Sequence, residues 1–362
     1  MGHELDTPAV LVDLDRLDAN IERMAAIARG AGVALRPHAK SHKLPQIGAR
    51  QLGAGAVGLT VAKLGEAEVF VDHGVTDLFL AYPIWGEAKW QRLCELSARA
   101  RITVAADSHE AVDGLSAVAA ANGHEIPVLV EIDCGFERCG VPDAEAALAL
   151  ARRIGDAPGV AFAGIMSFAG QSYDAGTRTA VEGVARHDAG ILSEAAGVIR
   201  AAGVEVAVVS AGGTPTARRV AEIGGVTEIR PGAYALSDRD QVALGWGALE
   251  DCALTVLTTV VSRPTATRAV VDAGTKTLSS DGSFQDDEWG TVVDRPDLRI
   301  ARLTEEHGIL TVPEGADLPI GTRLRVIPNH CCGTINMHDE VVAVRDGEVA
   351  ETWSVAARAK VR

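Results

Sequence analysis

A short apolar run and a loop rich in cations follow one another in the stretch Val33-Ala34-Leu35-Arg36-Pro37-His38-Ala39-Lys40-Ser41-His42-Lys43. The apolar run indicates a buried strand, and the loop begins at its carboxyl end, where barrels and open α/β sheets place their chemistry. Neighbouring cations favour the neutral form of a lysine, and a neutral amine can attack an aldehyde. The loop therefore suits a lysine that forms a Schiff base, although its charge alone is more typical of a solvated surface loop.

Strand-like and helix-like segments alternate outward from this stretch over the first two thirds of the chain. Eight short apolar runs lie near residues 33–37, 56–61, 77–81, 102–106, 126–132, 160–166, 205–210 and 226–230. Apolar residues at helical spacing separate these runs, as in Leu64–Val71 and Ala144–Ile154. Eight repeated βα units predict a (β/α)8 barrel better than an open doubly wound sheet, which remains the alternative.

The pattern changes near residue 240, after which helical periodicity is largely missing. Runs rich in β-branched residues occur at 254–262, 269–272, 323–327 and 341–344, with turn residues between them. These runs predict an antiparallel β domain. We expect the barrel at residues 14–240, and the β domain at residues 241–362 together with an N-terminal strand within residues 1–13.

Length, charge and cysteine usage narrow the class of protein. A chain of 362 residues is long enough for about two domains, and its net charge of −15 argues against nucleic-acid backbones and anionic membranes as partners. Six scattered cysteines lack the spacing of a disulfide framework, which indicates a reducing compartment. The polar, acidic N-terminus is unlike a signal peptide and no apolar stretch is long enough to span a membrane, so we expect a cytoplasmic protein.

Two glycine-containing loops follow neighbouring strands late in the predicted barrel. Residues 210–216 read Ser-Ala-Gly-Gly-Thr-Pro-Thr, and residues 230–234 read Arg-Pro-Gly-Ala-Tyr. Glycine amides can approach a phosphate closely, and threonine hydroxyls add donors. Barrels often bind phosphate at their late strand ends, so these loops are candidates for a phosphate site, although each alone could be an ordinary turn.

Another predicted strand ends in the segment Glu131–Gly140, which contains Arg138. Its guanidinium could hold a phenolate or a carboxylate by charge-assisted hydrogen bonds. Cys134 and Cys139 lie in the same segment, but they are five residues apart, unlike the closely spaced cysteines of a zinc knuckle. We interpret both as packing thiols.

The β domain contains the segment Pro328-Asn329-His330-Cys331-Cys332-Gly333-Thr334. In a strand, residues two apart point the same way, so His330 and Cys332 would share a face and Cys331 would point away. A thiolate beside an imidazole suits Zn²⁺ or another first-row divalent ion. Two protein ligands would leave room for water or substrate, and a buried pair without metal is the alternative.

These motifs together resemble one family. Seven segments occur in its order, at residues 36–43, 131–140, 212–214, 230–234, 272–276, 305–308 and 329–332. Over nearly its whole length the chain is similar to the D-threonine aldolase and D-serine dehydratase family of pyridoxal-phosphate enzymes. The resemblance implies an alanine-racemase-like fold, which is a (β/α)8 barrel plus a β domain. It also implies a homodimer, in which one subunit's barrel meets the other subunit's β domain.

The resemblance also implies roles for individual residues. Lys40 would be the Schiff-base lysine, and the expected catalytic set is Lys40, His42 and Arg138. The expected cofactor site consists of Lys40, Arg138, Ser210, Gly212, Gly213, Thr214, Gly232, Ala233 and Tyr234. His330 and Cys332 would hold a divalent metal such as Zn²⁺, Mn²⁺ or Mg²⁺.

Two reactions fit such a site, and both act on D-β-hydroxy-α-amino acids. Pyridoxal phosphate serves as an electron sink for a carbanion at Cα, and a metal can act as a Lewis acid on the β-hydroxyl. An aldolase converts D-threonine to glycine and acetaldehyde. A dehydratase converts D-serine or D-threo-3-hydroxyaspartate to a keto acid and ammonia. We expect the aldolase first and the dehydratase second.

The chain departs from parts of the family pattern. Similar aldolases can carry His-x-Asp at the metal position, whereas similar dehydratases carry His-x-Cys. This chain has His-x-Cys, at His330 and Cys332. Relatives often carry Tyr and His around the segment Gly164–Gln171, where this chain has Phe168 and Gln171. A general base from that segment is therefore in doubt, and His42 and His307 remain candidates. An amino-acid racemase and a noncatalytic carrier of pyridoxal phosphate are less favoured, since neither needs the metal pair.

Overall fold

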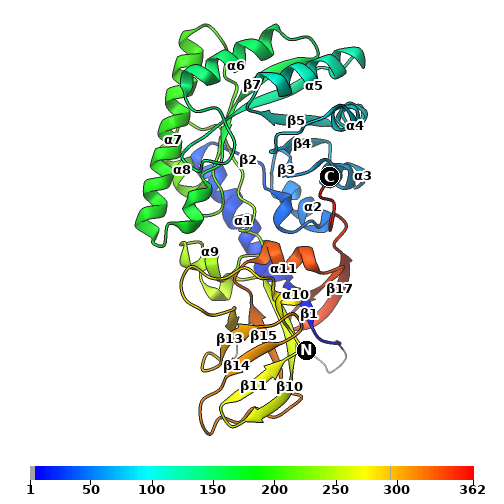
Figure 1. Cartoon of the computed structure of the whole chain (residues 1–362), viewed down its shortest axis with the longest axis vertical. Helices are drawn as coiled ribbons and strands as arrows, with labels where there is room; N and C mark the ends of the chain where they lie inside the picture. The colour runs from blue at the N-terminus through cyan, green and yellow to red at the C-terminus, as the bar shows by residue number, and fades with distance from the viewer. Residues whose placement is uncertain (1–4, 294) are drawn as a thin grey trace. The chain divides into compact units, whose positions relative to one another are not determined.

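The computed structural model describes residues 5–293 and 295–362, and the chain divides into two compact units (Figure 1). The barrel unit comprises residues 23–40, 47–232 and 360–362. The β unit comprises the chain up to residue 22, then residues 41–46 and 233–359. The chain therefore passes from one unit to the other five times, and one passage is the peptide bond between Lys40 and Ser41.

The barrel unit is built on eight parallel strands that pair in the order β2-β9-β8-β7-β6-β5-β4-β3. A parallel bridge between His38 and Thr60 joins the two ends of this order, just beyond β2, and closes the sheet. The strands are β2 (Ala34–Leu35), β3 (Leu59–Val61), β4 (Asp77–Leu80), β5 (Arg101–Ala106), β6 (Ile126–Ile132), β7 (Val160–Ser167), β8 (Val208–Ala211) and β9 (Glu228–Ile229). All eight lie within or beside the predicted runs, so the predicted (β/α)8 barrel is confirmed.

Helices follow the strands in alternation. They are α1 (Leu14–Ala31), α2 (Pro45–Gly53), α3 (Leu64–Asp72), α4 (Glu87–Ser97), α5 (His109–Ala121), α6 (Ala144–Asp156), α7 (Arg178–Ala201) and α8 (Ala217–Ile223). Polar side chains cap several N-termini: Asp143 Oδ1 accepts the amide of Ala146 at 2.8 Å and Thr177 Oγ1 accepts that of Ala180 at 3.2 Å. The buried side of α6, which includes Leu148 and Ile154, covers the sheet.

The strands of the barrel approach one another very closely at Gly164 of β7. This residue has φ of +144°, and a Cβ atom there would lie 1.9 Å from the carbonyl oxygen of Val208 in β8. Only glycine fits such a contact. The neighbouring side chains Phe79, Ala105, Leu129 and Met166, from four consecutive strands, form one buried apolar cluster. The close approach and the cluster fix the strand ends that carry the polar residues described below.

The β unit is a nine-stranded sheet in the order β11-β14-β13-β12-β15-β10-β1-β16-β17, with an added pairing of β10 and β11. The β-branched runs predicted an antiparallel β domain, which is confirmed, and the pairing of β10 with β11 closes six of its strands into a barrel. The strands are β1 (Ala9–Asp13), β10 (Leu254–Thr265), β11 (Arg268–Val271), β12 (Thr291–Val292), β13 (Arg299–Leu303), β14 (Gly308–Thr311), β15 (Arg323–Ile327), β16 (Glu340–Arg345) and β17 (Glu348–Ser354). Strand β1 pairs antiparallel with β10 and parallel with β16, around a buried cluster that includes Leu11 and Leu257.

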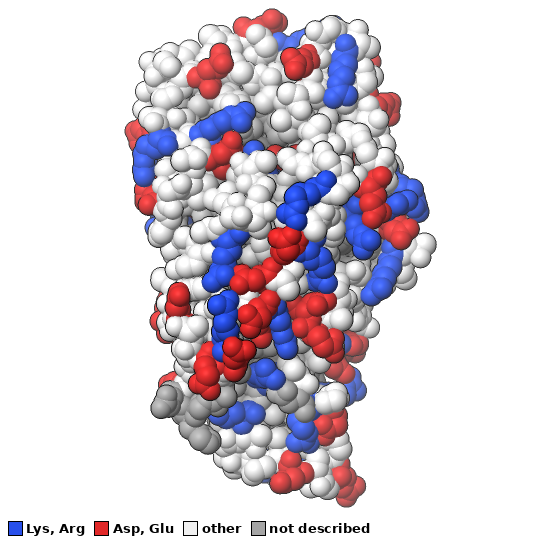
Figure 2. All heavy atoms as spheres, turned by 180° about the vertical axis from the view of Figure 1, so that it is seen from behind, with Lys and Arg blue, Asp and Glu red and all other residues white. Residues whose placement is uncertain are grey.

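Short helices complete the β unit. They are α9 (Arg239–Ala243), α10 (Thr275–Leu278) and α11 (Cys331–Met337). The whole chain also has the 3₁₀ turns η1 (Ala39–Ser41), η2 (Gly170–Asp174) and η3 (Leu249–Asp251) among its described residues. The six cysteines, all within the described residues, are free thiols. Figure 2 shows acidic and basic side chains interspersed over one face of the molecule. Across residues 5–293 and 295–362, the helices are too short or too polar to cross a membrane.

Candidate active site

Three residues of the predicted cofactor site surround one aromatic ring in the barrel unit. Lys40 lies in η1, in the loop that follows β2, and its Nζ is 5.5 Å from the centroid of the Phe168 ring. The Cζ atom of Arg138 is 4.8 Å from the same centroid. A Cβ atom on Gly213 would lie 3.6 Å from Cε2 of Phe168. Residues from the ends of β2, β6 and β8 therefore converge on the first residue after β7.

Phe168 belongs to an aromatic group that the sequence did not reveal. Its ring packs edge-on against Phe136 at 5.7 Å between centroids, and it lies 6.5 Å from the ring of Tyr173 in η2. The sequence showed Phe168 only as a departure from relatives. Its position just after a predicted strand could have identified it as a site residue, because residues at the strand ends share the rim that carries the other site residues.

The glycine loop after β8 is shaped for close contact by a ligand. Gly212 has φ of +80°, and a Cβ atom there would lie 3.0 Å from Cα of Ala217. Gly213 donates its amide to Oγ1 of Thr216 at 3.2 Å, and Thr214 is buried. The space that a side chain on Gly213 would fill is bounded by the Phe168 ring and by the Tyr173 hydroxyl, at 3.6 Å and 3.4 Å. A small anionic group such as a phosphate can approach a glycine backbone closely, because no side chain stands in its way.

A network of buried charges lies at the ends of β8 and β9. Arg230 is buried and donates to Oγ of Ser210 and to the carbonyl oxygen of Ser167, both at 2.5 Å. Ser210 in turn donates to Oε1 of Glu228 at 2.5 Å. The predicted cofactor residue Ser210 therefore has its hydroxyl engaged in this network. Burial lowers the pKa of Arg230, and the nearby carboxylates, Glu228 foremost, oppose that effect.

The network continues to the predicted strand β2 and its loop. Arg36 donates Nε to Oε2 of Glu228 at 2.7 Å and Nη1 to Oδ1 of Asp77 at 2.5 Å. Burial lowers the pKa of Arg36, but the two carboxylates outweigh burial and leave that pKa raised. The first residue of the cation-rich stretch is thus a buried structural cation.

Arg138 approaches Glu131 at the end of β6, with Nη2 and Oε1 3.4 Å apart. Burial raises the pKa of Glu131, and the positive charge of Arg138 opposes the rise. Burial also raises the pKa of the Cys134 and Cys139 thiols. Neutral thiols at both positions agree with packing roles, and Arg138 keeps an exposed guanidinium beside the Phe168 ring.

The remaining predicted cofactor and catalytic residues lie at or beyond the boundary of the barrel unit. Gly232 is its last residue before the β unit, to which Ala233, Tyr234 and His42 belong. Tyr234 is fully buried and packs edge-on against Trp246 at 6.2 Å. His42 is fully buried, and its Nδ1 accepts the amide of Leu44 at 3.0 Å, which places the ring proton on Nε2.

The predicted metal pair has a different local structure from the one expected. The strand prediction for residues 330–332 is wrong: His330 is the N-cap of α11, and Cys332 lies in the first turn of that helix. A side-chain hydrogen bond nevertheless joins His330 and Cys332, while Cys331 is fully buried. A helix start, rather than strand alternation, therefore brings the imidazole and the thiol together.

A buried carboxylate lies beside this pair in the β unit. Oδ2 of Asp238 accepts the amide of Cys331 at 2.9 Å and lies 3.6 Å from Nδ1 of His330. Burial raises the pKa of Asp238 to about 6, although the charge of His330 opposes the rise. The negative charge of Cys332 raises the pKa of His330 to about 10, against the effect of burial.

The donor set of His330 and Cys332 fits a borderline-soft divalent ion such as Zn²⁺. Within the described residues, no cluster of three or more His, Cys, Asp or Glu side chains is arranged to hold a metal. A metal bound to this pair would need further ligands such as water or substrate, which is typical of catalytic rather than structural zinc.

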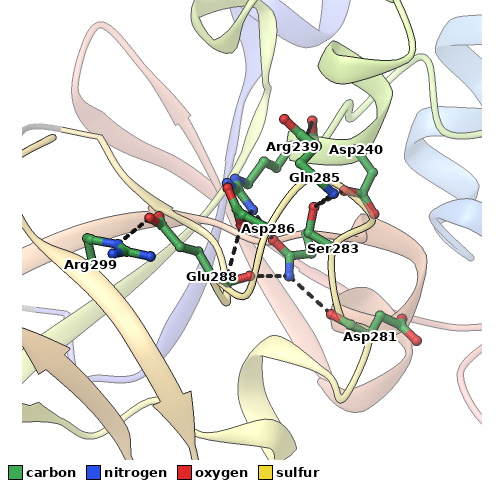
Figure 3. Close-up of polar contacts among 9 residues, drawn as sticks. Arg239, Asp240, Asp281, Ser283, Gln285, Asp286, Glu288 and Arg299 are labelled. Carbon is green, nitrogen blue, oxygen red and sulfur yellow. Dashed lines mark hydrogen bonds and ion pairs between the residues drawn. The ribbon is translucent and has the colours of Figure 1, made fainter. Parts of the chain in front are cut away.

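The residues after Asp238 are tied to the segment 281–288 (Figure 3). Ser283 donates to Oδ1 of Asp240 at 2.9 Å, and Gln285 donates to the carbonyl oxygen of Arg239 at 3.3 Å. Arg239 forms a paired contact with the Asp286 carboxylate. The side-chain amide of Asn329, next to His330, also donates to the carbonyl oxygens of Asp281 and Glu288, at 3.2 and 2.9 Å.

Two further motifs of the predicted family order pack together in the β unit. A Cβ atom on Gly274 would lie 2.3–2.5 Å from backbone atoms of residues 304–307, so glycine is required for that contact. Lys276 forms ion pairs with Glu305 at 2.9 Å and with Glu306 at 2.7 Å. His307 is exposed in the same turn, and its carbonyl oxygen accepts the amide of Thr304.

The chain is similar to known proteins over almost its whole length. Residues 12–240 match the family described as alanine racemase, N-terminal domain, and residues 253–344 match the putative serine dehydratase domain. D-threonine aldolase of Arthrobacter sp. is 38% identical, over 98% of this chain and 93% of that protein. D-threo-3-hydroxyaspartate dehydratase of Delftia sp. strain HT23 is 36% identical, over 96% and 97%. The chain belongs to the D-threonine aldolase and D-serine dehydratase family of lyases.

Solved structures of the same family superpose well on this chain. D-threonine aldolase from Filomicrobium marinum superposes with a TM-score of 0.93 at 35% identity, covering 99% of this chain and 96% of that one. A cysteine-to-alanine variant of a D-threo-3-hydroxyaspartate dehydratase, described as metal-free, superposes with a TM-score of 0.91 at 35% identity, covering 97% of each chain. The family is one of pyridoxal-phosphate-dependent enzymes with the alanine-racemase-like fold.

Proposed function

We propose that this protein is a lyase, dependent on pyridoxal phosphate and a divalent metal, that cleaves D-threonine and similar D-β-hydroxy-α-amino acids to glycine and an aldehyde. The observation that carries the proposal is the convergence of Lys40, Arg138 and the Gly213 backbone on the Phe168 ring. An amine, a guanidinium and a paired-glycine loop on one barrel rim suit a phosphorylated aldehyde.

Each of these residues has a distinct part in the proposed site. The cofactor, when bound, supplies an electron sink for negative charge at Cα of the substrate. Lys40 would hold the cofactor aldehyde through Nζ, and the Gly212–Thr214 loop would hold its phosphate. Arg138, with its guanidinium exposed on the rim, would hold the phenolate or a substrate carboxylate by charge-assisted hydrogen bonds. Phe168 would exclude water from one side of Lys40 and Arg138.

We also propose that His330 and Cys332 hold the metal, which when bound would act as a Lewis acid toward the substrate β-hydroxyl. The hydrogen-bonded pair and the buried Asp238 beside it support this assignment. The dehydratase relative whose cysteine variant is described as metal-free supports it as well. In that protein, a histidine-to-alanine variant changes a residue two positions earlier, which matches the His330-x-Cys332 spacing.

The reaction itself is tested by product analysis with D-threonine and D-serine. We expect glycine and acetaldehyde from D-threonine, and activity that EDTA abolishes and added Mn²⁺ or Zn²⁺ restores. Keto acid and ammonia from D-serine, with no glycine from D-threonine, would instead support the second candidate, a dehydratase, which the thiolate ligand favours. Activity on L-isomers alone, or full activity in EDTA, would contradict both.

Replacing the two adjacent cysteines separately tests the metal assignment. We expect Cys332→Ala to lower metal affinity and activity by at least about 10-fold, with partial rescue by excess metal, because removing a ligand weakens the site. Cys331→Ala is the matched control, since it removes the neighbouring thiol, which is fully buried and not a proposed ligand. Metal content is measured by atomic emission after dialysis. Equal metal loss in both variants would contradict the assignment of Cys332 as a ligand.

A further inference from the structure

The 3₁₀ turn η2 holds Tyr173 against the glycine loop of the barrel unit. A Cβ atom on Gly213 would lie 3.4 Å from the Tyr173 hydroxyl and 3.7 Å from its ring. The hydroxyl therefore borders the space that the missing side chain of Gly213 leaves open. Any group that contacts the Gly213 backbone from this side also lies within reach of the Tyr173 hydroxyl.

Contacts from two directions fix η2 and with it the tyrosine. Gln171 donates Nε2 to the carbonyl oxygen of Cys134 at 2.8 Å, which ties η2 to the end of β6. A Cβ atom on Gly170 would lie only 2.4 Å from the Phe136 ring, so η2 packs directly on that ring. The ring of Tyr173 lies 6.5 Å from that of Phe168. A side chain held this way can donate a hydrogen bond without first being ordered.

The chemistry of the loop selects the kind of ligand that the hydroxyl would meet. A phosphate presents three strong acceptor oxygens, and a phenolic O–H is a good neutral donor to an anionic oxygen. The other two tyrosines do not occupy such a place: Tyr82 lies beside Lys63, and Tyr234 is fully buried in the β unit.

We infer that Tyr173 is a phosphate-binding residue, whose hydroxyl donates a hydrogen bond to the phosphate of pyridoxal phosphate held on the Gly212–Thr214 loop. This inference rests on the proposed function, since it requires that the loop binds the cofactor phosphate. It adds a side-chain donor from η2 to a site that sequence motifs place only on the β8 and β9 loops.

The test compares two cofactor forms that differ only in the phosphate. Apoprotein of the full chain is titrated with pyridoxal phosphate and with pyridoxal, following the absorbance change on binding. We expect Tyr173→Phe to raise the dissociation constant of pyridoxal phosphate by about 10-fold and to leave that of pyridoxal unchanged, because only the phosphate loses a charge-assisted hydrogen bond. Tyr82→Phe, the same change at an exposed tyrosine of the same unit, should alter neither constant.

The outcomes separate this inference from the proposed function. Weaker binding of the phosphorylated form alone supports a phosphate contact by Tyr173. Equal weakening of the binding of both forms would show that the Tyr173 ring serves only in packing. No weakening of either would show that Tyr173 does not contribute to cofactor binding. Either result overturns the inference and leaves the proposed cofactor binding intact. If the unchanged protein binds neither form, the proposed function fails and the inference fails with it.

Discussion

Replacing Lys40 by alanine should lower kcat by at least about 10⁴-fold, the scale seen when a covalent catalytic group is removed. Lys40 has the position that the proposed chemistry requires, since it lies in η1 of the loop after β2, with its amine 5.5 Å from the Phe168 ring centroid. Reduction of the unchanged protein with borohydride, followed by peptide mass analysis, should find the cofactor attached to Lys40 and should abolish the visible absorbance band.

The nearby Lys43 provides the matched control for Lys40. Its side chain is buried, and Nζ donates to the carbonyl oxygen of Ala357 at 3.5 Å within the β unit. This contact indicates a structural role, so Lys43→Ala should retain the covalent cofactor and most of its kcat. Cofactor found on Lys43 rather than Lys40, or equal loss of the absorbance band in both variants, would contradict the assignment.

Replacing Glu228 by glutamine should lower the free energy of unfolding by about 3–5 kcal/mol. Removing one charge of a buried ion pair leaves the partner's charge buried and uncompensated. Glu228 accepts hydrogen bonds from Arg36 and from Ser210, which also accepts from the buried Arg230. The amide of glutamine can keep part of this geometry but not the negative charge. Both arginines would then remain buried with less compensation.

The control for Glu228 is the same substitution on an exposed ion pair of the barrel unit. Glu222 pairs with Arg218 at 3.0 Å on the surface of α8, with its side chain 43% exposed. Solvent screens such a pair, so Glu222→Gln should change the free energy of unfolding by no more than about 1 kcal/mol. Urea unfolding measured by circular dichroism compares the two variants. Similar losses for both would show that burial of the network does not determine its contribution.

The elements of the barrel could be predicted from the sequence because each depends on residues close together in the chain. Apolar runs such as 126–132 and the helical spacing at 144–154 are local signals, and both elements are present in the structure. The buried network could not be predicted in the same way. Arg36 and Glu228 are 192 residues apart, and only closure of the barrel brings β2 beside β9.

The candidate site shows the same division between local and distant information. The loop positions of Lys40, Arg138 and Gly213 followed from strand ends, but Phe168 gained its meaning only from the side chains that surround it. The strand prediction at His330 failed for a different reason. A three-residue segment carries no measurable period, and the helix start there is stabilised by Asp238, which accepts the Cys331 amide from 93 residues away.

The five passages of the chain between the units constrain how such a protein can change over generations. A single genetic exchange moves one continuous piece of sequence, whereas each unit here is assembled from three separate pieces. A single recombination event therefore cannot replace either unit with the corresponding unit of another protein. The passage between Lys40 and Ser41 strengthens this constraint, because the proposed catalytic lysine is the last residue of its unit at that boundary. Diversification of substrate preference in a chain threaded in this way should proceed by point substitution rather than by domain shuffling.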